Sequence, residues 1–157
     1  MARRRRPEKR LILPDPRFGD LVISKFINNL MMKGKKSIAE TIFYDSLEII
    51  SSKLKTDAPE EIFKKALENA TPMLEVRSRR IGGSTYQVPI EVTPKRKQAL
   101  AMRWLIDFSR LGNGKSMAIK LANELISASK NEGPTIEKKK NTHKMAEANK
   151  AFAHFRV

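Results

Sequence analysis

The residues with the clearest chemical capacity in this chain of 157 amino acids are arginines and lysines that gather at expected turns. Residues 76–92 read Val-Arg-Ser-Arg-Arg-Ile-Gly-Gly-Ser-Thr-Tyr-Gln-Val-Pro-Ile-Glu-Val, with three arginines before the Gly82-Gly83 pair. An arginine side chain can bind a phosphate through two parallel N–H groups and can also stack on a base. The pattern therefore predicts a surface that binds a phosphate-rich partner.

The same stretch predicts a β-hairpin. Gly82-Gly83 supplies the positive φ angles of a tight two-residue turn, and β-prone residues flank it on both sides. Such a turn pairs Arg77 with Val88 and Arg79 with Tyr86. The apolar residues of the two strands then fall on opposite faces, so we expect the ribbon to stand out from the core. An ordinary surface hairpin with solvated arginines is the alternative.

A second cationic group follows the hairpin. Thr93-Pro94 is a helix-start signal, which places Lys95, Arg96 and Lys97 in the first helical turn. Cations are unfavourable there by about 0.3–1 kcal/mol each, but become favourable if a phosphate lies over the helix end. A solvated charge run is the alternative for this group. Three more lysines, which an ordinary loop would also explain, lie in the turn between the first two expected helices, at Lys33, Lys35 and Lys36.

The net charge of +15 is distributed in blocks along the chain. Residues 1–36 hold eleven Lys/Arg against three Asp/Glu and residues 76–120 hold ten against two, whereas residues 37–75 hold four against eight. Alternating blocks favour one face for a polyanion and another for water, which makes nucleic acid the leading partner. A membrane surface fits less well, because the arginines lie in tails and turns and no apolar run could span a bilayer.

Helical periodicity places these groups on a mainly α-helical framework. We expect residues 1–19 to form a basic N-terminal extension without structure of its own, and residues 20–157 to form a single helical domain. That domain has about six helices, with the two-stranded hairpin arm, at about residues 73–92, protruding between the third and fourth. The expected helices run from Asp20 toward Gly34, from a capping box of Ser37 and Glu40, from Asp57 to Thr71-Pro72, from Pro94 to Leu111, from Lys115 to Gly133 and from Thr135 to Phe152.

Catalytic and metal chemistry find little support. The chain has no cysteine, and the spacing of His143 and His154 matches no usual zinc site. Gly114-Lys115-Ser116 resembles the end of a phosphate-binding loop, but Ser109 stands where that motif needs its first glycine. We therefore expect no enzyme, no metal site and no cofactor.

Several motifs resemble the bacterial type of small-subunit ribosomal protein number seven. The three longest motifs are residues Arg79 to Pro89, Ala99 to Trp104 and Met145 to His154. Shorter matches are Leu13-Pro14-Asp15-Pro16, Gly34-Lys35-Lys36-Ser37 and Lys115-Ser116-Met117-Ala118. Together they span nearly the whole chain in order.

The resemblance implies a structural constituent of the small ribosomal subunit in the cytoplasm. It implies primary binding to 16S rRNA, nucleation of the subunit head in the 3′ major domain, and a position near the exit-site tRNA at the subunit interface. Implied partners are 16S rRNA, exit-site tRNA and neighbouring small-subunit proteins numbers nine and eleven, with no membrane. The implied rRNA-binding residues are Arg3, Arg4, Arg5, Arg6, Arg10, Lys33, Lys35, Lys36, Arg77, Arg79, Lys95, Arg96 and Arg103. Residues assigned to the hairpin tip, for contact with tRNA or protein, are Arg80, Gly82, Gly83 and Tyr86.

A DNA-binding architectural or regulatory protein would share the charge and the β-ribbon. Such a protein is ordinarily a dimer with an apolar interface outside its core. The expected helices leave no spare apolar stripe for that interface, so this class ranks second.

Overall fold

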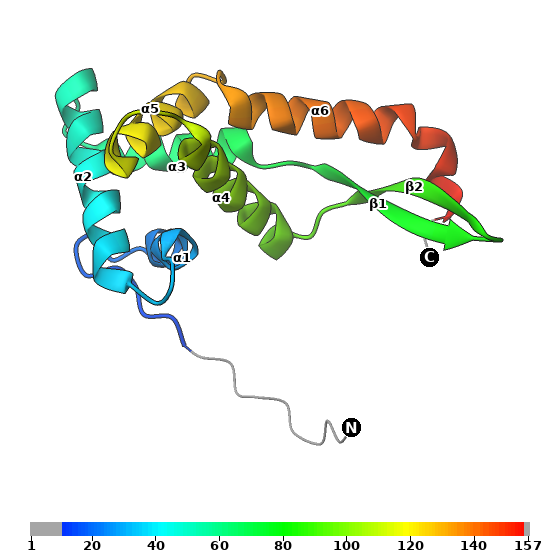
Figure 1. Cartoon of the computed structure of the whole chain (residues 1–157), viewed down its shortest axis with the longest axis horizontal. Helices are drawn as coiled ribbons and strands as arrows, with labels where there is room; N and C mark the ends of the chain where they lie inside the picture. The colour runs from blue at the N-terminus through cyan, green and yellow to red at the C-terminus, as the bar shows by residue number, and fades with distance from the viewer. Residues whose placement is uncertain (1–10, 156–157) are drawn as a thin grey trace. The chain divides into compact units, whose positions relative to one another are not determined.

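The computed structural model of the chain describes residues 11–155. Contacts divide the chain into two compact units, residues 1–40 and residues 41–157, and each is considered separately. The described residues contain six α-helices, one 3-10 helix and one two-stranded antiparallel sheet (Figure 1). The sheet is a hairpin between the third and fourth helices, which confirms the predicted fold class. None of the helices in this part of the chain is both long and apolar enough to cross a membrane.

The first unit contains helix α1, Leu21–Leu30. Asp20 caps it, because its carboxylate accepts a hydrogen bond of 2.7 Å from the backbone N–H of Val22. The buried face of the helix consists of Ile23, Ser24, Phe26, Ile27 and Leu30. The predicted start of this helix is therefore confirmed.

The segment before α1 makes specific hydrogen bonds from Leu13 onward. Asp15 is only 2% exposed, and its carboxylate accepts hydrogen bonds of 3.1 Å from the backbone N–H groups of both Arg17 and Phe18. The hydroxyl of Ser24 donates to the carbonyl oxygen of Leu13 at 2.7 Å. Residues 13–19 are therefore ordered by these hydrogen bonds, while residues 1–10 lie outside the described part, and the predicted basic extension of residues 1–19 stays a prediction.

The turn between the first two helices differs from the prediction. Helix α1 ends at Leu30 rather than at Gly34, and α2, Lys36–Leu54, already begins at Lys36. Lys33 and Gly34 both have positive φ angles, 52° and 75°, and the N–H of Lys35 donates to the carbonyl of Met32. This tight turn starts the helix one residue before Ser37, so α2 begins earlier than the sequence predicts.

Three helices form the centre of the second unit: α3, Pro59–Ala70; α4, Pro94–Leu111; and α5, Met117–Ser129. They pack against one another, and Phe43 of α2 meets Phe63 of α3 edge to face with ring centroids 5.3 Å apart. Helix α4 buries Leu100 and Leu105 as predicted, but Leu111 is 72% exposed. The core side chains of this unit include Ile50, Ala66, Met102, Ile106, Leu121 and Leu125.

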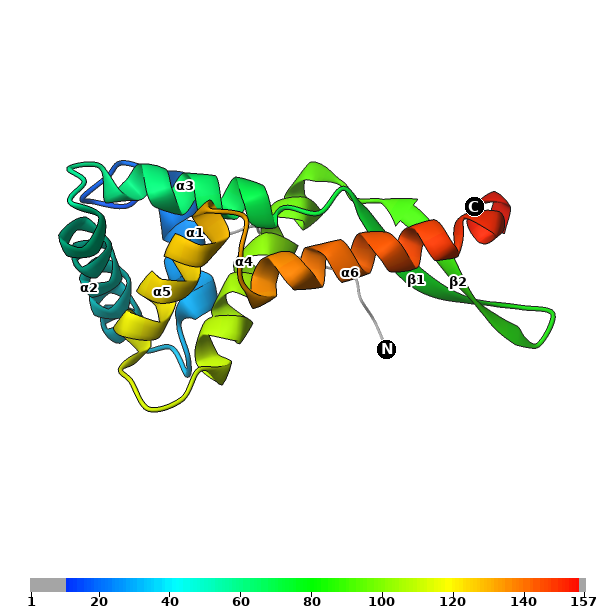
Figure 2. The ribbon, with the colours of Figure 1, turned by 90° about the horizontal axis from the view of Figure 1, so that it is seen from above.

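The chain ends in α6, Pro134–Ala148, followed by the 3-10 helix η1, Lys150–Phe155. The predicted single helix to Phe152 is therefore broken after Ala148. Its buried face also differs from the predicted stripe, because Met145 is 47% exposed whereas Thr142 and Ala146 are buried. Figures 1 and 2 both show α6 running alongside the hairpin.

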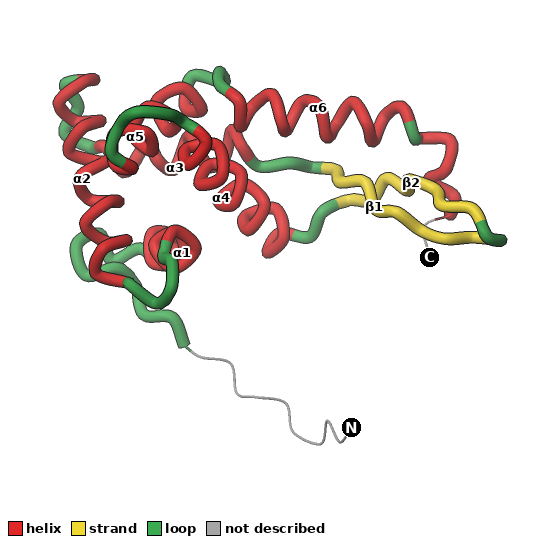
Figure 3. Tube along the Cα trace, in the orientation of Figure 1, coloured by secondary structure: helices red, strands yellow, loops and turns green. Residues whose placement is uncertain are grey.

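The hairpin consists of β1, Leu74–Ile81, and β2, Ser84–Glu91 (Figure 3). Arg77 pairs with Val88 and Arg79 with Tyr86, which confirms the predicted register. The φ angles at the turn are 55° for Gly82 and 91° for Gly83, the pair of positive values that a type I′ turn requires. Glycine at both positions lets the chain reverse without steric strain.

The expectation of a free-standing ribbon is wrong for the part nearest the core. Val88 and Pro89 point to opposite faces of the strand, and both are buried, so both faces are covered there. Helix α6 contacts both strands, and η1 contacts β2. The side chains that cover this part of the hairpin come from α6 and η1, a contact that the sequence alone does not indicate. Residues 77–85, which we call the outer hairpin, are exposed as predicted.

Candidate nucleic-acid interface

A buried carboxylate lies at the centre of the cationic residues near the hairpin. Glu75, the second residue of β1, is 8% exposed. Its Oε1 accepts a hydrogen bond from Nε of Arg77 at 2.9 Å and lies 2.8 Å from Nη2 of the same residue. Nε of Arg96 donates to Oε2 at 2.9 Å and to Oε1 at 3.2 Å. One carboxylate thus holds two guanidinium groups, which we call the arginine pair.

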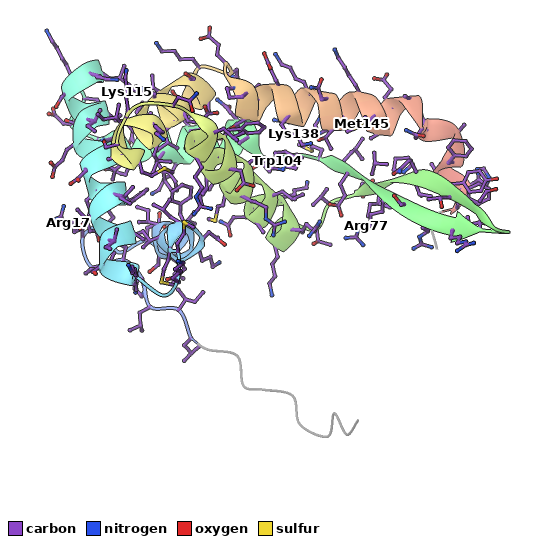
Figure 4. The ribbon with its side chains drawn as sticks, viewed as in Figure 1. Arg17, Arg77, Trp104, Lys115, Lys138 and Met145 are labelled. Atoms are coloured by element: carbon purple, nitrogen blue, oxygen red, sulfur yellow. The ribbon has the colours of Figure 1, made fainter. Side chains whose placement is uncertain are left out.

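Local structure brings these three side chains together. Glu75 and Arg77 are two positions apart on one strand, so they share a face of the sheet. Arg96 lies in the first turn of α4, which begins at Pro94, three residues after the end of β2. The N–H of Val92 donates to the carbonyl oxygen of Met73 at 3.1 Å and closes the base of the hairpin. The start of α4 is thereby held against β1, with Arg77 on the hairpin close by (Figure 4).

The arginine pair is held on one side by buried Glu75, and its other side is exposed to solvent. The side chain of Glu75 is 10% exposed, whereas those of Arg77 and Arg96 are 57% and 44% exposed. Two arginines against one carboxylate leave one positive charge in excess, and Lys95 is exposed on the same helical turn. Lys97 is half-buried, with its Nζ 3.9 Å from the sulfur of Met73. The four cations can therefore present a positive surface to an anion.

A second cationic group lies in the first unit. Lys33 and Lys35 are exposed in the turn between α1 and α2, and Lys36 is exposed as the first residue of α2. Lys36 approaches Glu40 at 3.7 Å, an exposed pair one helical turn apart that contributes little to stability. The predicted rRNA-binding residues outside the described part of the chain are Arg3, Arg4, Arg5, Arg6 and Arg10.

The remaining predicted residues lie apart from the arginine pair. Arg79 and Arg80 are exposed on the outer hairpin, and Arg103 is exposed about two turns along α4. Gly82 and Gly83 form the turn, as predicted for a tip. Tyr86 does not belong to the tip: its ring is half-buried and its centroid lies 5.3 Å from those of both Phe152 and Phe155 of η1. We call these three residues the aromatic cluster.

The base of the hairpin is also tied to α6. Nε2 of His143 accepts a hydrogen bond of 3.0 Å from the N–H of Met73, and Nζ of Lys139 donates to the carbonyl oxygen of Asn69 at 2.7 Å. Burial lowers the pKa of His143, and the positive charge of Lys139 lowers it further. Burial also lowers the pKa of Lys139, against the opposing effect of Glu68. One of these two bonds therefore holds Met73, directly before the strand that carries Glu75, and the other holds the C-terminal end of α3.

Sequence reasoning missed Glu75 and the two phenylalanines. The spacing Glu75-Val76-Arg77 was the available signal, because alternate residues of a strand share a face and can form an ion pair. For Phe152 and Phe155 the sequence carried no signal that they meet Tyr86, which lies more than sixty residues away.

Comparison with known proteins gives the family. The model of the family described as ribosomal protein S7p/S5e matches residues 2–150. A protein of Novosphingobium aromaticivorans named small ribosomal subunit protein uS7 is 56% identical over 156 residues, which cover 99% of each chain. Proteins of the same name from Anaeromyxobacter dehalogenans strain 2CP-C and Caulobacter vibrioides are 58% and 54% identical, with the same coverage. The chain therefore belongs to the ribosomal protein S7p/S5e family.

Proposed function

We propose that the chain is a structural protein of the small ribosomal subunit, located in the cytoplasm, and that it binds 16S rRNA directly. Membership of a ribosomal protein family supports a structural role rather than an enzymatic one. In the proposal, the protein binds the 3′ major domain, nucleates assembly of the subunit head and lies near the exit-site tRNA at the subunit interface. The observation that carries the RNA-binding claim is the exposed arginine pair, Arg77 and Arg96, on its buried carboxylate.

The chemistry of this surface suits the backbone of a folded RNA. Phosphate contacts from Arg and Lys fix the position of a protein on nucleic acid and supply much of the affinity. Aromatic residues make up 6% of the chain, and the aromatic cluster occupies three of them in packing against one another. Few aromatic side chains therefore remain to form a platform on which several unpaired bases could stack. Recognition by shape and backbone is therefore favoured.

The proposed site divides between the two ends of the hairpin. The residues near the base of the hairpin bind rRNA, and the tip contacts tRNA or neighbouring subunit proteins, numbers nine and eleven. Lys33, Lys35 and Lys36 of the first unit bind rRNA as a separate group. For rRNA the proposed residues within the described part are Lys33, Lys35, Lys36, Arg77, Arg79, Lys95, Arg96 and Arg103. For the tip they are Arg80, Gly82 and Gly83, because Tyr86 is held in the aromatic cluster.

Competition binding tests this proposal. The full-length protein is bound to a labelled transcript of the 16S 3′ major domain and challenged with unlabelled transcript or with duplex DNA of equal length. We expect the transcript to compete far more effectively. Preference for duplex DNA would overturn the ribosomal assignment and support a DNA-binding protein.

A matched pair of variants locates the binding surface. The Arg77→Ala/Arg96→Ala variant should bind the transcript more weakly than the Lys138→Ala/Lys140→Ala variant. Both remove two positive charges, but Lys138 and Lys140 are exposed on α6, outside the proposed site. Equal losses of affinity would mean that net charge alone governs binding.

A further inference from the structure

We propose that Glu75 is a positioning residue for RNA binding: it holds the side chains of Arg77 and Arg96 in one orientation, ready for a single stretch of phosphodiester backbone. This inference rests on the proposed function and deepens it. An acidic residue inside an anion-binding surface looks adverse at first, because it repels phosphate. The contacts of Glu75 show how it can nevertheless favour binding.

The carboxylate engages each arginine along one edge only. Nε and Nη2 of Arg77 face Oε1, and Nε of Arg96 faces both carboxylate oxygens. An arginine has five N–H groups, so of the ten in the pair these contacts use three and leave seven. The exposed parts of both side chains can therefore form bidentate contacts with phosphate oxygens while Glu75 holds the opposite edges.

Holding the arginines reduces the entropic cost of binding. A free arginine side chain loses rotamer freedom when it is fixed, so a pair that is fixed before RNA arrives loses less conformational entropy on binding. Glu75 is itself fixed, because it is buried and because Met73, two residues earlier, is bonded to Val92 and to His143. The anchor thus belongs to a rigid part of the fold.

A different role for Glu75 predicts the opposite result. If Glu75 served only to neutralise charge or to tie α4 to the hairpin, its removal would leave a surface with one more net positive charge. Affinity for a polyanion would then rise, since electrostatic attraction dominates binding to phosphates. If Glu75 positions the arginine pair, its removal lowers affinity despite the gain in positive charge. The sign of the change therefore separates the two roles.

The test uses the full-length protein and the transcript of the 16S 3′ major domain. We expect Glu75→Gln to weaken binding about tenfold and to lower the steepness of the salt dependence by about one unit, as for a lost phosphate contact. Glu147→Gln is the matched control, because Glu147 is exposed on α6 and its loss changes the net charge equally. It should leave affinity unchanged or raise it. In an Arg77→Ala/Arg96→Ala background, Glu75→Gln should not weaken binding further, because no arginine pair remains to be positioned.

The outcomes separate this inference from the proposed function. If Glu75→Gln binds as tightly as the parent protein or more tightly, while Arg77→Ala/Arg96→Ala binds weakly, the positioning role is wrong and the RNA site stands. If Arg77→Ala/Arg96→Ala binds as the parent does, the arginine pair is no RNA site and both claims about it fail.

A second variant keeps the inference testable if circular dichroism shows that Glu75→Gln does not fold. Arg77→Lys/Arg96→Lys keeps both charges and permits ion pairs with Glu75, but it lacks the planar guanidinium groups that the carboxylate orients. Weakened binding by this folded variant supports the positioning role. Unchanged binding would show that orientation does not matter and would overturn it.

Discussion

Arg96 lies at a helix start that is electrostatically unfavourable for a positive charge, and its ion pair with Glu75 compensates for this. In the first turn of α4 the helix dipole disfavours a cation by about 0.3–1 kcal/mol. Glu75 is buried and accepts two hydrogen bonds from Nε of Arg96. A buried carboxylate that loses a charged partner costs about 1–3 kcal/mol, so the ion pair outweighs the dipole. The cations of this turn are thus not equivalent.

Two glutamate substitutions should therefore change stability in opposite directions. Arg96→Glu places a second carboxylate beside Glu75, and we expect the free energy of unfolding to fall by about 1–3 kcal/mol. Lys95→Glu, one position earlier and exposed, should raise it by about 0.3–1 kcal/mol at low ionic strength. Urea denaturation of the free protein measures both. A gain in stability from Arg96→Glu would contradict the assigned role of Glu75.

His143 should make stability depend on pH. Its pKa in the native protein is lowered by burial and by Lys139, and its neutral ring accepts the N–H of Met73. Below the ordinary pKa of about 6.5 the unfolded chain takes up a proton before the native chain does, so the free energy of unfolding falls as pH falls. This loss begins near pH 6.5 and ends once native His143 is also protonated.

Thermal melts between about pH 7.5 and pH 5 test this linkage. His143→Gln should show a smaller decrease in melting temperature over that interval than the parent protein. His154→Gln is the control and should show the same decrease as the parent. A His143→Gln variant with an unaltered decrease would mean that other groups cause the pH dependence.

At the scale of elements, the C-terminal segment stabilises the hairpin. The rings of Phe152 and Phe155 both lie 5.3 Å from that of Tyr86, and α6 contacts both strands. A two-stranded hairpin alone is marginally stable in water, so these contacts explain how the arm keeps its structure.

Loss of the aromatic cluster should loosen the hairpin while the helical core stays intact. In Phe152→Ala/Phe155→Ala we expect faster hydrogen exchange at the backbone amides of β1 and β2 and no change in α4 and α5. Leu111→Ala, which truncates a side chain that is 72% exposed, is the control. Unchanged exchange in the hairpin would show that α6 and the strand ladder suffice.

The tip of the hairpin, residues 80–85, should in contrast be dispensable for folding. Excision of residues 80–85 with a new two-residue turn keeps Tyr86 in the aromatic cluster and removes only exposed residues. Helicity and binding to the 16S transcript should remain near parental values, while reconstituted subunits should release exit-site tRNA at a changed rate. Failure of those subunits to assemble a head would assign the tip to the primary rRNA site. Unaltered tRNA release together with unaltered protein contacts would remove any separate role for the tip.

The sequence predicted elements best where local signals decide them. The Gly82-Gly83 turn, the strand register and the start of α4 at Thr93-Pro94 depend on a few adjacent residues, and all three predictions are confirmed. The covered base of the hairpin was missed, because it depends on Phe152 and Phe155 from the far end of the chain. Glu75 was missed for the same reason: its partner Arg96 lies 21 positions away, across the hairpin.

At the scale of the whole molecule, charge is the feature that connects sequence with proposed function. The chain carries +15, and its basic blocks include Lys33, Lys35 and Lys36, at the turn before α2 and its first residue, and the hairpin with α4. Helix α3, in the acidic block, begins with Glu60 and Glu61, which favourably complement the dipole at its start. Acidic residues thus stabilise the start of α3, where no RNA contact is proposed, whereas basic residues gather at the proposed RNA contacts.

The salt dependence of RNA binding tests the central claim most directly. The affinity of the full-length protein is measured for a transcript of the 16S 3′ major domain and for an equally long transcript of the 5′ domain, over a range of potassium chloride concentrations. If about six to ten phosphates are neutralised, the slope of log K against log salt for the 3′ transcript should be about −4 to −9. Affinity for the 3′ transcript should exceed that for the 5′ transcript throughout. A slope near zero, or equal affinity for the two transcripts, would contradict the account.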